Sequence, residues 1–260
     1  MEYKDYKEFA RQRRIDVLKM THAAQSSHVG SNLSCIDLLS VIYNLVDLSR
    51  LGELTKDVVL VKPWAAAAVY ACLVAKGFLP EEAITRYGED KWTTILEPML
   101  PYIPFATGAM GYNLPAAVGF ALAKKIKQEE GRVYCVISDG ECQIGSTWES
   151  ALIAAHHLLD NLTVIIDNNG FQAMGRTKEI LNIHPLVDKW RSFGWFVQTI
   201  DGHDLQTIES RLKSPDSGNP RVFIADTIKG KGVSFFQNDN LWHYSHVSES
   251  VLNEALKELQ

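Results

Sequence analysis

Two polar segments follow two apolar runs of this chain. Asp139 comes directly after the run 133–138, and Asn169 comes two residues after the run 162–167. A segment with helical periodicity separates the runs, which predicts two buried parallel strands joined by a helix. Because ligands bind beyond the carboxyl ends of neighbouring parallel strands, we expect Asp139 and Asn169 to face the same ligand.

These residue types are suited to a magnesium ion. Mg²⁺ prefers an octahedral shell of oxygen ligands and commonly shares it between a few protein groups and phosphate oxygens. Asp139 would supply a charged oxygen, Asn169 a neutral one and Phe171 a backbone carbonyl. Gly140 and Gly170 leave room for the backbone to approach a ligand. Asp-Gly and Asn-Gly are each typical of an ordinary turn, but together on consecutive strands they predict a magnesium–diphosphate site.

Further motifs occur in a fixed order along nearly the whole chain. They are Ser-His-Val-Gly-Ser at 27–31, Thr-Gly-Ala-Met-Gly at 107–111, Asp-Lys-Trp-Arg-Ser-Phe-Gly-Trp at 188–195, Asp-Gly-His-Asp at 201–204 and Thr-Ile-Lys-Gly-Lys-Gly-Val at 227–233. Together they resemble the N-terminal, diphosphate-binding half of a transketolase, and more closely the separate small subunit of a split transketolase. The resemblance implies that thiamine diphosphate and Mg²⁺ are the cofactors.

The resemblance also implies catalytic roles for three residues. His28 and His243 match active-site histidines that lie near the substrate, and each could transfer protons near neutral pH. Glu149 matches an acid between the two cofactor sites of the family's dimer. A glutamate in the first turn of a helix, stabilised by the helix dipole, explains Glu149 equally well.

A glycine-containing loop precedes the helix predicted over 113–128. Gly108 and Gly111 would let a diphosphate reach the free N–H groups of that helix N-terminus, although a Gly-x-x-Gly pattern alone is typical of plain loops. Met110 would pack against the cofactor or fill the core. The other cofactor-binding residues that the resemblance implies are Asp139, Gly140, Glu141, Asn169, Phe171 and His243.

Half of the cofactor site is expected on another chain. In this family, the glutamate that activates the cofactor ring lies on a second, pyrimidine-binding domain. The strands predicted within residues 1–260 account for a single diphosphate-binding domain. The resemblance therefore implies a partner subunit that carries the pyrimidine-binding domain, in an α2β2 heterotetramer with its sites at subunit interfaces.

The chain departs from the family pattern near the reacting centre. Trp64 and Glu97 stand where the family has two histidines that hold the hydroxyl groups of a ketose donor. An indole offers a single donor, and a carboxylate repels a phosphate. We therefore expect a two-carbon ketol transfer with a non-standard substrate. An acyl transfer of the pyruvate type and a non-catalytic partner subunit remain alternatives.

Composition favours a cytoplasmic protein without nucleic-acid or membrane partners. The 260 residues are 46% hydrophobic, which is enough for one large core, and a net charge of −5 without a basic run gives nucleic-acid binding no support. No stretch reaches the roughly 18 apolar residues of a membrane span. The four cysteines form no CxxC pair, which is typical of reduced thiols in the cytoplasm.

Strands and helices alternate along the chain, which predicts an α/β fold with a doubly wound, mostly parallel sheet and helices on both faces. Ser34 is the expected N-cap of the second helix. Lys229 and Lys231 are expected in a solvated loop, and cations that face a phosphate are the alternative for them. The strands are predicted at 56–62, 133–138, 162–167, 195–200 and 221–227. The helices are predicted at 5–24, 34–46, 64–76, 80–88, 113–128, 147–159, 185–193, 204–213 and from 248 onward, with 89–106 irregular.

Overall fold

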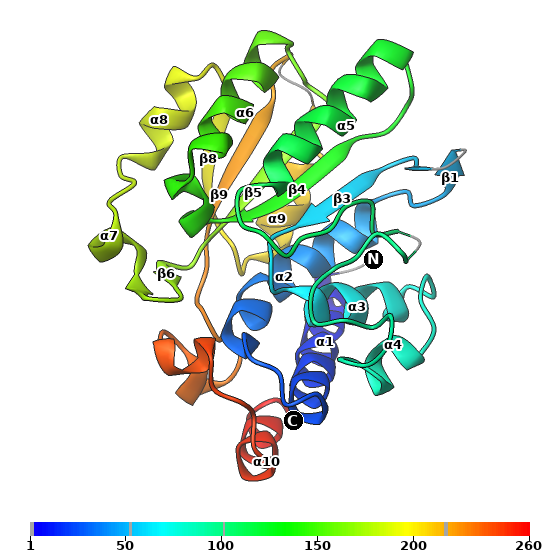
Figure 1. The fold of residues 1–260 in the computed structure, drawn as a ribbon, viewed down its shortest axis with the longest axis vertical. Coiled ribbons are helices and arrows are strands. Elements are labelled where there is room, and N and C mark those ends of the chain that lie inside the picture. Colours follow the sequence, from blue (N-terminus) through cyan, green and yellow to red (C-terminus); the bar gives the residue numbers. More distant parts are fainter. Residues whose placement is uncertain (1–2, 52–53, 101, 216–217) are drawn as a thin grey trace.

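A five-stranded, all-parallel sheet forms the centre of the molecule (Figure 1). The computed structural model describes residues 3–51, 54–100, 102–215 and 218–260. The strand order is β3-β4-β5-β9-β8. The strands are β3 (Val58–Val61), β4 (Val133–Ser138), β5 (Leu162–Asn168), β8 (Phe196–Asp201) and β9 (Arg221–Asp226). All five predicted strands are thereby confirmed, with ends that differ by two residues at most.

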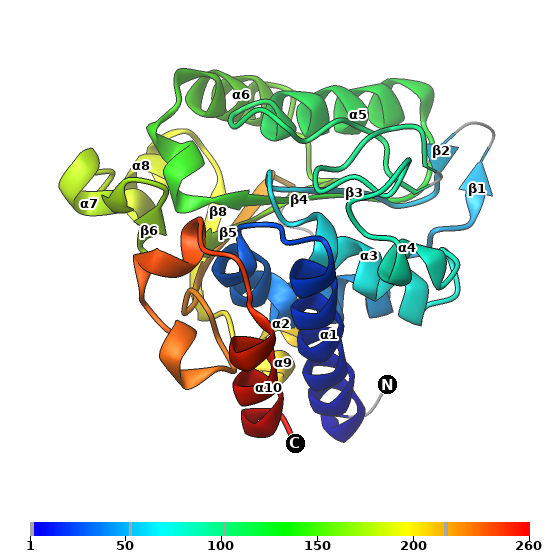
Figure 2. The ribbon, with the colours of Figure 1, turned by 60° about the horizontal axis from the view of Figure 1, so that its bottom comes forward.

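Helices cover both faces of the sheet, so the molecule has three layers (Figure 2). One face carries α5 (Asn113–Lys127), α6 (Gly145–His156) and α8 (Leu186–Ser192). The other face carries α1 (Tyr3–Ala23), α2 (Val29–Leu45), α3 (Ala66–Ala75) and α9 (Leu205–Leu212), with α10 (Glu249–Glu258) against α1. The predicted α/β class, with a parallel sheet between two helical layers, is confirmed.

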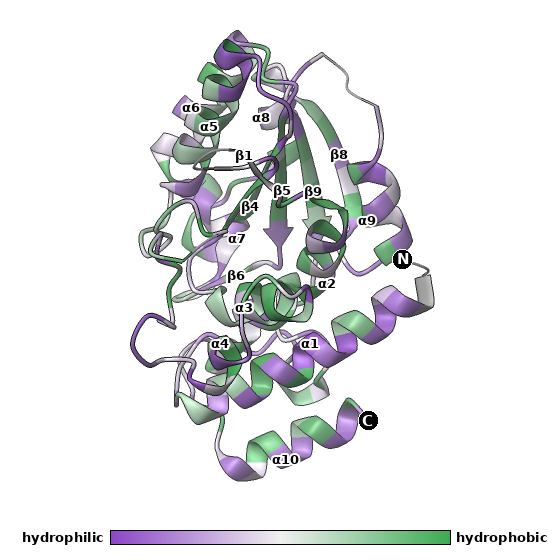
Figure 3. Cartoon of the chain, turned by 90° about the vertical axis from the view of Figure 1, so that its right-hand side faces the viewer, coloured by the Kyte–Doolittle hydropathy of each residue, from purple (hydrophilic) through white to green (hydrophobic). Residues whose placement is uncertain are grey.

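The central strands are buried on both faces because each face packs against its own hydrophobic cluster. Every residue of β3 is buried, and so are all but the last residues of β4 and β5. Figure 3 shows β5 as hydrophobic along its length and hydrophilic at its C-terminal end. Such continuous apolar runs are typical of parallel strands, and the change to polar residues marks the edge where the site is built.

The ends of β4 and β5 finish at the same level. Ser138 is paired with Asp167, so the residues after them emerge side by side at the carboxyl edge. A short 3-10 helix, η1 (Asp139–Gln143), follows β4 and begins with a capping box formed by Ser138 and Glu141. Asp139 is thereby fixed directly at the end of its strand.

The predicted start of the second helix is wrong. Helix α2 begins at Val29, and its N-cap is His28, which has a left-handed backbone with φ of 70°. Ser34 therefore lies inside the helix, where its Oγ donates to the carbonyl of Ser31 and to Oδ2 of Asp167. A serine hydroxyl can accept from a free N–H group at the start of a helix, and it can equally donate to a helix carbonyl or to a distant carboxylate. Here it donates to the Ser31 carbonyl and to the buried carboxylate of Asp167.

The smaller elements lie at the edges of the molecule. They are the hairpins β1 (Arg50–Leu51) with β2 (Leu54–Thr55) and β6 (Phe171–Gln172) with β7 (Gly175–Arg176), the helices α4 (Glu82–Thr85) and α7 (Thr177–Ile180), and the 3-10 helices η2 (Ser234–Phe236) and η3 (Asn240–His243). The described residues of 89–106 form no helix or strand, as predicted. Among the described helices, none is long and apolar enough to span a bilayer.

Candidate active site

A cavity of about 410 Å³ opens at the carboxyl edge of the sheet. Its walls come from the start of α2, the ends of β3, β4 and β5, the loop before α5, and η3. The lining residues are Ser27, His28, Ser31, Lys62, Pro63, Trp64, Met110, Ser138, Gly140, Asn169, Phe171, Gln172, Ala173, His243 and Tyr244. Segments far apart in the sequence therefore meet at one site.

Asp139 and Asn169 lie at adjacent strand ends. Asp139 is 1% exposed, and its Oδ2 accepts hydrogen bonds from the N–H of Gly170 at 3.1 Å and from Thr177 Oγ1 at 2.7 Å. Asn169 lines the large cavity, and its Oδ1 accepts from the N–H of Phe171 at 3.0 Å. Asp139 itself lines a neighbouring cavity of about 170 Å³. Hydrogen bonds thus connect Asp139 to Gly170 and Asn169 to Phe171, so the three predicted metal ligands lie close together at the carboxyl edge of the sheet.

The surroundings of Asp139 suit a cation. Burial is the main cause that raises the pKa of its carboxyl to about 6, and the nearby carboxylate of Asp167 adds to the rise. A bound cation would stabilise the charged form. The candidate ligands of Asp139, Asn169 and Phe171 are all oxygen atoms, which Mg²⁺ prefers over nitrogen or sulfur. The residues present therefore fit a magnesium ion.

A buried polar network below the cavity was not predicted. Asp167 is fully buried and accepts hydrogen bonds from Lys62 Nζ, Thr227 Oγ1, Ser34 Oγ at 2.5 Å and Asn169 Nδ2 at 3.1 Å. Burial acts to raise the pKa of Asp167, but Lys62 and these hydrogen bonds outweigh it and hold the pKa below its usual value. Because Asn169 donates to Asp167 through its nitrogen, its amide oxygen points away from that carboxylate.

Four ring side chains form part of the cavity wall. The ring of His28 stacks on Trp64 with the centroids 4.6 Å apart, and it lies 4.7 Å from the ring of His243 and 5.7 Å from Tyr244. Both predicted histidines thus line one cavity together. Trp64 adopts a left-handed backbone with φ of 64° and covers one face of His28.

The two histidines are neutral at pH 7. Burial, together with the charges of Lys229 and Lys62, lowers the pKa of His28 to about 4, and burial with Lys229, His28 and Lys62 lowers that of His243 to about 3. Lys229 is 1% exposed and its Nζ donates to Nδ1 of His243 at 2.8 Å. The prediction that Lys229 is solvated is therefore wrong, because its loop folds inward against η3.

The loop before α5 is tied to the end of β4. Oε1 of Glu141 accepts from the N–H of Gly111 at 3.2 Å, and its Oε2 accepts from the N–H of Ser138 at 2.8 Å. Glu141 is buried and does not line the cavity, so it acts on the site through this loop. Met110 is 41% exposed and lines the cavity, whereas Gly108 is half-buried outside its wall.

Two further residues singled out from the sequence lie away from the cavity. Glu149 is exposed on α6 and shares its face with the exposed side chains of Leu152 and Ile153, three and four residues further on. Glu97 is half-buried in the irregular segment and lines neither this cavity nor its neighbours. Of the two positions where the resemblance implies that a histidine is replaced, only Trp64 lines the cavity.

The fold and the site define an α/β domain of the thiamine diphosphate-binding class. The family model described as "Transketolase, thiamine diphosphate binding domain" matches residues 6–259. The chain belongs to the transketolase family, and its resemblance to that family is confirmed.

Relatives and solved structures agree with this assignment. The chain is 36% identical to one subunit of the apulose-4-phosphate transketolase of Actinobacillus succinogenes over 256 residues, which cover 95% of this chain and 92% of that protein. It is also 36% identical over 250 residues to the 6-deoxy-6-sulfo-D-fructose transketolase subunit SqwG of a Clostridium species, covering 90% and 88%. A transketolase structure from Campylobacter jejuni superposes with a TM-score of 0.91 at 26% identity, and the chain covers 43% of that protein's length.

Proposed function

We propose that this chain is the diphosphate-binding subunit of a Mg²⁺- and thiamine diphosphate-dependent transketolase that transfers a two-carbon ketol unit. The observation that carries the proposal is one arrangement at the sheet edge. Asp139, Asn169 and Phe171 lie together at the ends of β4 and β5, beside a cavity that also holds His28 and His243. An oxygen ligand set next to proton-transfer groups is what such an enzyme requires.

Each of these residues has a part in the proposed site. The carboxylate of Asp139, the amide oxygen of Asn169 and the carbonyl of Phe171 would hold Mg²⁺, and the loop at Gly111 would present the N-terminus of α5 to the diphosphate. Thiamine diphosphate, when bound, would supply the nucleophilic carbon that ketol transfer from a ketose requires. His28 and His243, neutral at pH 7, would hold substrate hydroxyls and move protons at their ring nitrogens.

A second subunit is expected to complete the site. Two of the relatives are each named as one subunit of an apulose-4-phosphate transketolase, and the face of α6 formed by Glu149, Leu152 and Ile153 exposes apolar surface that suits an interface. We infer that a partner with the pyrimidine-binding domain joins this chain in an α2β2 heterotetramer. The four free, buried cysteines support a cytoplasmic location.

The donor is expected to differ from an ordinary sugar phosphate. Two relatives are named for apulose 4-phosphate and for 6-deoxy-6-sulfo-D-fructose, which supports specialised ketoses as a class. In this chain Trp64 lies against His28 and reshapes the wall where a histidine would bond a donor hydroxyl. Substrate binding is therefore the feature of the site that we expect to be altered.

The complex of this chain with its second subunit tests the proposal. It would be supplied with thiamine diphosphate and Mg²⁺ and offered phosphorylated ketoses, a nonphosphorylated ketose, hydroxypyruvate and pyruvate. We expect two-carbon transfer from a ketose or from hydroxypyruvate. Turnover of pyruvate alone would replace the proposal with acyl transfer, and bound cofactor without any turnover would make the chain a non-catalytic subunit.

The metal site has its own test. Asp139→Ala removes the charged ligand, so we expect it to weaken Mg²⁺-dependent thiamine diphosphate binding by more than roughly tenfold. Isothermal titration of the complex, with and without Mg²⁺, measures the effect. Asp188→Ala, which removes an exposed carboxylate on α8, is the matched control and is expected to bind normally. Unchanged cofactor binding in Asp139→Ala would overturn the assignment of the ligand.

A further inference from the structure

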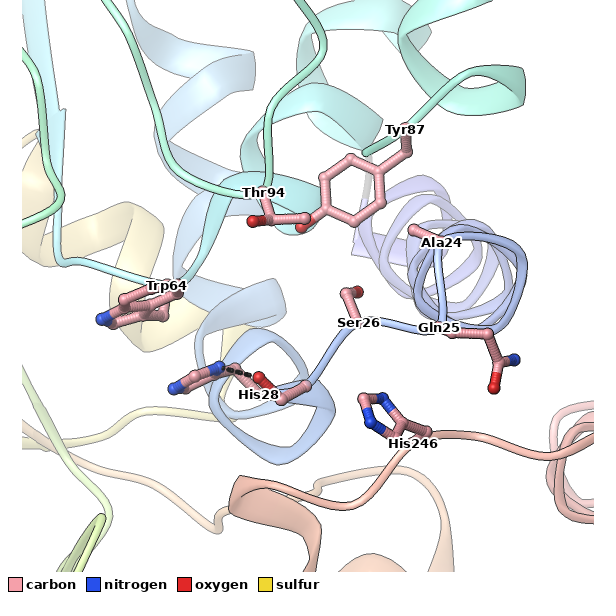
Figure 4. A pocket seen from close by; sticks show the side chains of 9 residues that line it. Ala24, Gln25, Ser26, His28, Trp64, Tyr87, Thr94 and His246 are labelled. Atoms are coloured by element: carbon pink, nitrogen blue, oxygen red, sulfur yellow. Dashed lines mark hydrogen bonds between the residues drawn. The ribbon is translucent and has the colours of Figure 1, made fainter. Parts of the chain in front are cut away.

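A second cavity, of about 260 Å³, lies on the far side of the stacked rings of His28 and Trp64 (Figure 4). Three residues, Ser27, His28 and Trp64, line both cavities, so the stacked pair is their common wall. The other residues that line the second cavity are Ala24, Gln25, Ser26, Tyr87, Thr94 and His246. A molecule that reacts in the first cavity could therefore extend past the edge of this pair into the second.

Among the described residues that line it, the second cavity has no permanently charged side chain that would attract an anion. Its described lining contains no lysine, arginine, aspartate or glutamate. It also adjoins the C-terminal end of α1, where the N–H groups of Ala24 and Ser26 are already bonded to the carbonyls of Met20 and Thr21. A helix C-terminus carries partial negative charge. A phosphate or sulfonate in this cavity would find neither a cation nor free helix N–H groups among the described residues.

The cavity does offer hydrogen-bonding groups that suit alcohols. Thr94 and His246 line it from opposite sides (Figure 4), and in the described part of the chain no hydrogen bond involves either side chain. The hydroxyl oxygen of Ser26 is buried and has no hydrogen-bond partner among the described residues. Hydroxyl and imidazole groups both donate and accept, so they can match a row of substrate hydroxyls without any charge.

We propose that this second cavity is the subsite for the far end of the substrate and that it selects an uncharged polyhydroxyl chain over a phosphorylated one. The inference rests on the proposed ketol transfer, and it names the substrate class of the same site. The carbonyl end would lie beside His28 and His243 in the first cavity, and the terminal hydroxyls would bond Thr94 and His246. Thr94 is then a specificity-determining residue.

Binding of unreactive analogues tests the subsite without turnover. The complex, with thiamine diphosphate and Mg²⁺, would be titrated with a pentitol and with the terminal phosphate ester of the same pentitol, and binding followed by saturation-transfer NMR. We expect the pentitol to bind more tightly than its phosphate. Thr94→Arg places a guanidinium in the cavity and should reverse this order, because arginine pairs with phosphate.

Turnover gives an independent measurement. Thr94→Val keeps the shape of the side chain and removes its hydroxyl, so we expect KM for a hydroxyl-terminated ketose to rise by about threefold to tenfold with kcat little changed. Thr94→Arg should raise kcat/KM for a phosphate-terminated ketose relative to the hydroxyl-terminated one by roughly tenfold or more. Thr85→Val and Thr85→Arg, on the exposed surface of α4, are the matched controls and should leave the ratios unchanged.

The outcomes separate the subsite from the proposed reaction. The subsite would be overturned if the wild-type complex bound the phosphate ester better than the pentitol. It would also be overturned if the Thr94 variants changed neither the binding order nor the kcat/KM ratio. Neither result would refute the proposed ketol transfer. Pentitol binding that depends on Thr94, in a complex that transfers nothing from any ketose, would support the subsite and refute the reaction.

Discussion

The histidines of the site owe their protonation states to buried neighbours. A protonated lysine only donates hydrogen bonds, so Lys229 fixes Nδ1 of His243 as an acceptor and leaves the ring proton on Nε2. Burial and the charge of Lys62 lower the pKa of Lys229 to about 8, which still leaves it mostly protonated at pH 7. His243 is therefore a neutral donor, and Lys229 is a positioning residue.

Lys229→Met keeps the length of this side chain and removes its charge. Because Lys229 lowers the pKa values of both His28 and His243, we expect both values to rise in the variant. Loss of the fixed ring tautomer should also lower kcat/KM by roughly tenfold or more. NMR titration of the histidine ring protons measures the pKa values and reports the tautomer of His243.

The control for this experiment is Lys231→Met, which removes the charge of a half-buried lysine in the same loop. It should leave both histidine titrations in place, because neither pKa owes its shift to Lys231. Histidine titrations that are the same in Lys229→Met and in the wild type would contradict the positioning role.

At the scale of elements, one buried carboxylate joins four of them. Asp167 is the second-last residue of β5. It accepts hydrogen bonds from Ser34 of α2, from Lys62 after β3 and from Thr227 after β9. A buried ion pair is expensive to desolvate and is stable only when its remaining lone pairs are satisfied. Here they are satisfied by hydroxyls and by Asn169, so the network fixes the sheet edge on which the proposed cofactor site rests.

The loop before α5 is shaped by steric fit. Gly111 has φ of 83°, a conformation that favours glycine, and a Cβ at this position would lie 2.7 Å from Cγ2 of Ile144. A Cβ added at Gly119, in the exposed part of α5, would meet no atom within 4 Å, and the φ of this glycine is not positive. The two glycines therefore form a natural pair for comparison.

Gly111→Ala should lower the free energy of unfolding by about 1–2 kcal/mol, because the alanine is strained where glycine is not. Gly119→Ala should raise it by about 0.5–1 kcal/mol, because alanine favours the helix. Chemical denaturation of both variants measures the difference. We also expect weaker thiamine diphosphate binding in Gly111→Ala only. Equal stability changes in the two variants would show that the loop has room to relax.

At the scale of the whole molecule, one outer face is incompletely covered. Helices α5 and α6 lie side by side on one face of the sheet (Figure 2). Leu152 is 57% exposed on α6, next to Ile153 and on the same side as Glu149. Exposed apolar groups of this kind mark interaction surfaces, and the proposed second subunit is the partner that we assign to this face.

Leu152→Glu tests the assignment. A buried, unpaired carboxylate at an interface is strongly unfavourable, so we expect the affinity for the second subunit to fall by at least roughly tenfold. Sedimentation velocity of the mixed subunits measures assembly. Gln206→Glu adds the same charge on α9, on the opposite face of the sheet, and should assemble normally. Full assembly of Leu152→Glu would place the interface elsewhere.

Much of the fold could be predicted from the sequence because its strands are apolar on both faces. Runs such as 133–138 and 162–167 are short, continuously apolar and rich in β-branched residues, which favours a buried parallel strand over a buried helix. The proximity of Asp139 and Asn169 followed from the same pattern, since consecutive parallel strands end at one edge. Ser34 was misplaced because a serine suits a helix start and a buried hydrogen bond equally well.

The sequence by itself determined the order of strands and helices, the family and the polar residues at the strand ends, because these depend on local periodicity and short spacing. Only the tertiary structure decided that Lys229 is buried against His243, that Asp167 joins four elements, and that His28 and Trp64 stack between two cavities. Those contacts join residues far apart in the chain. Burial and long-range packing, which no local pattern encodes, set their charges and orientations.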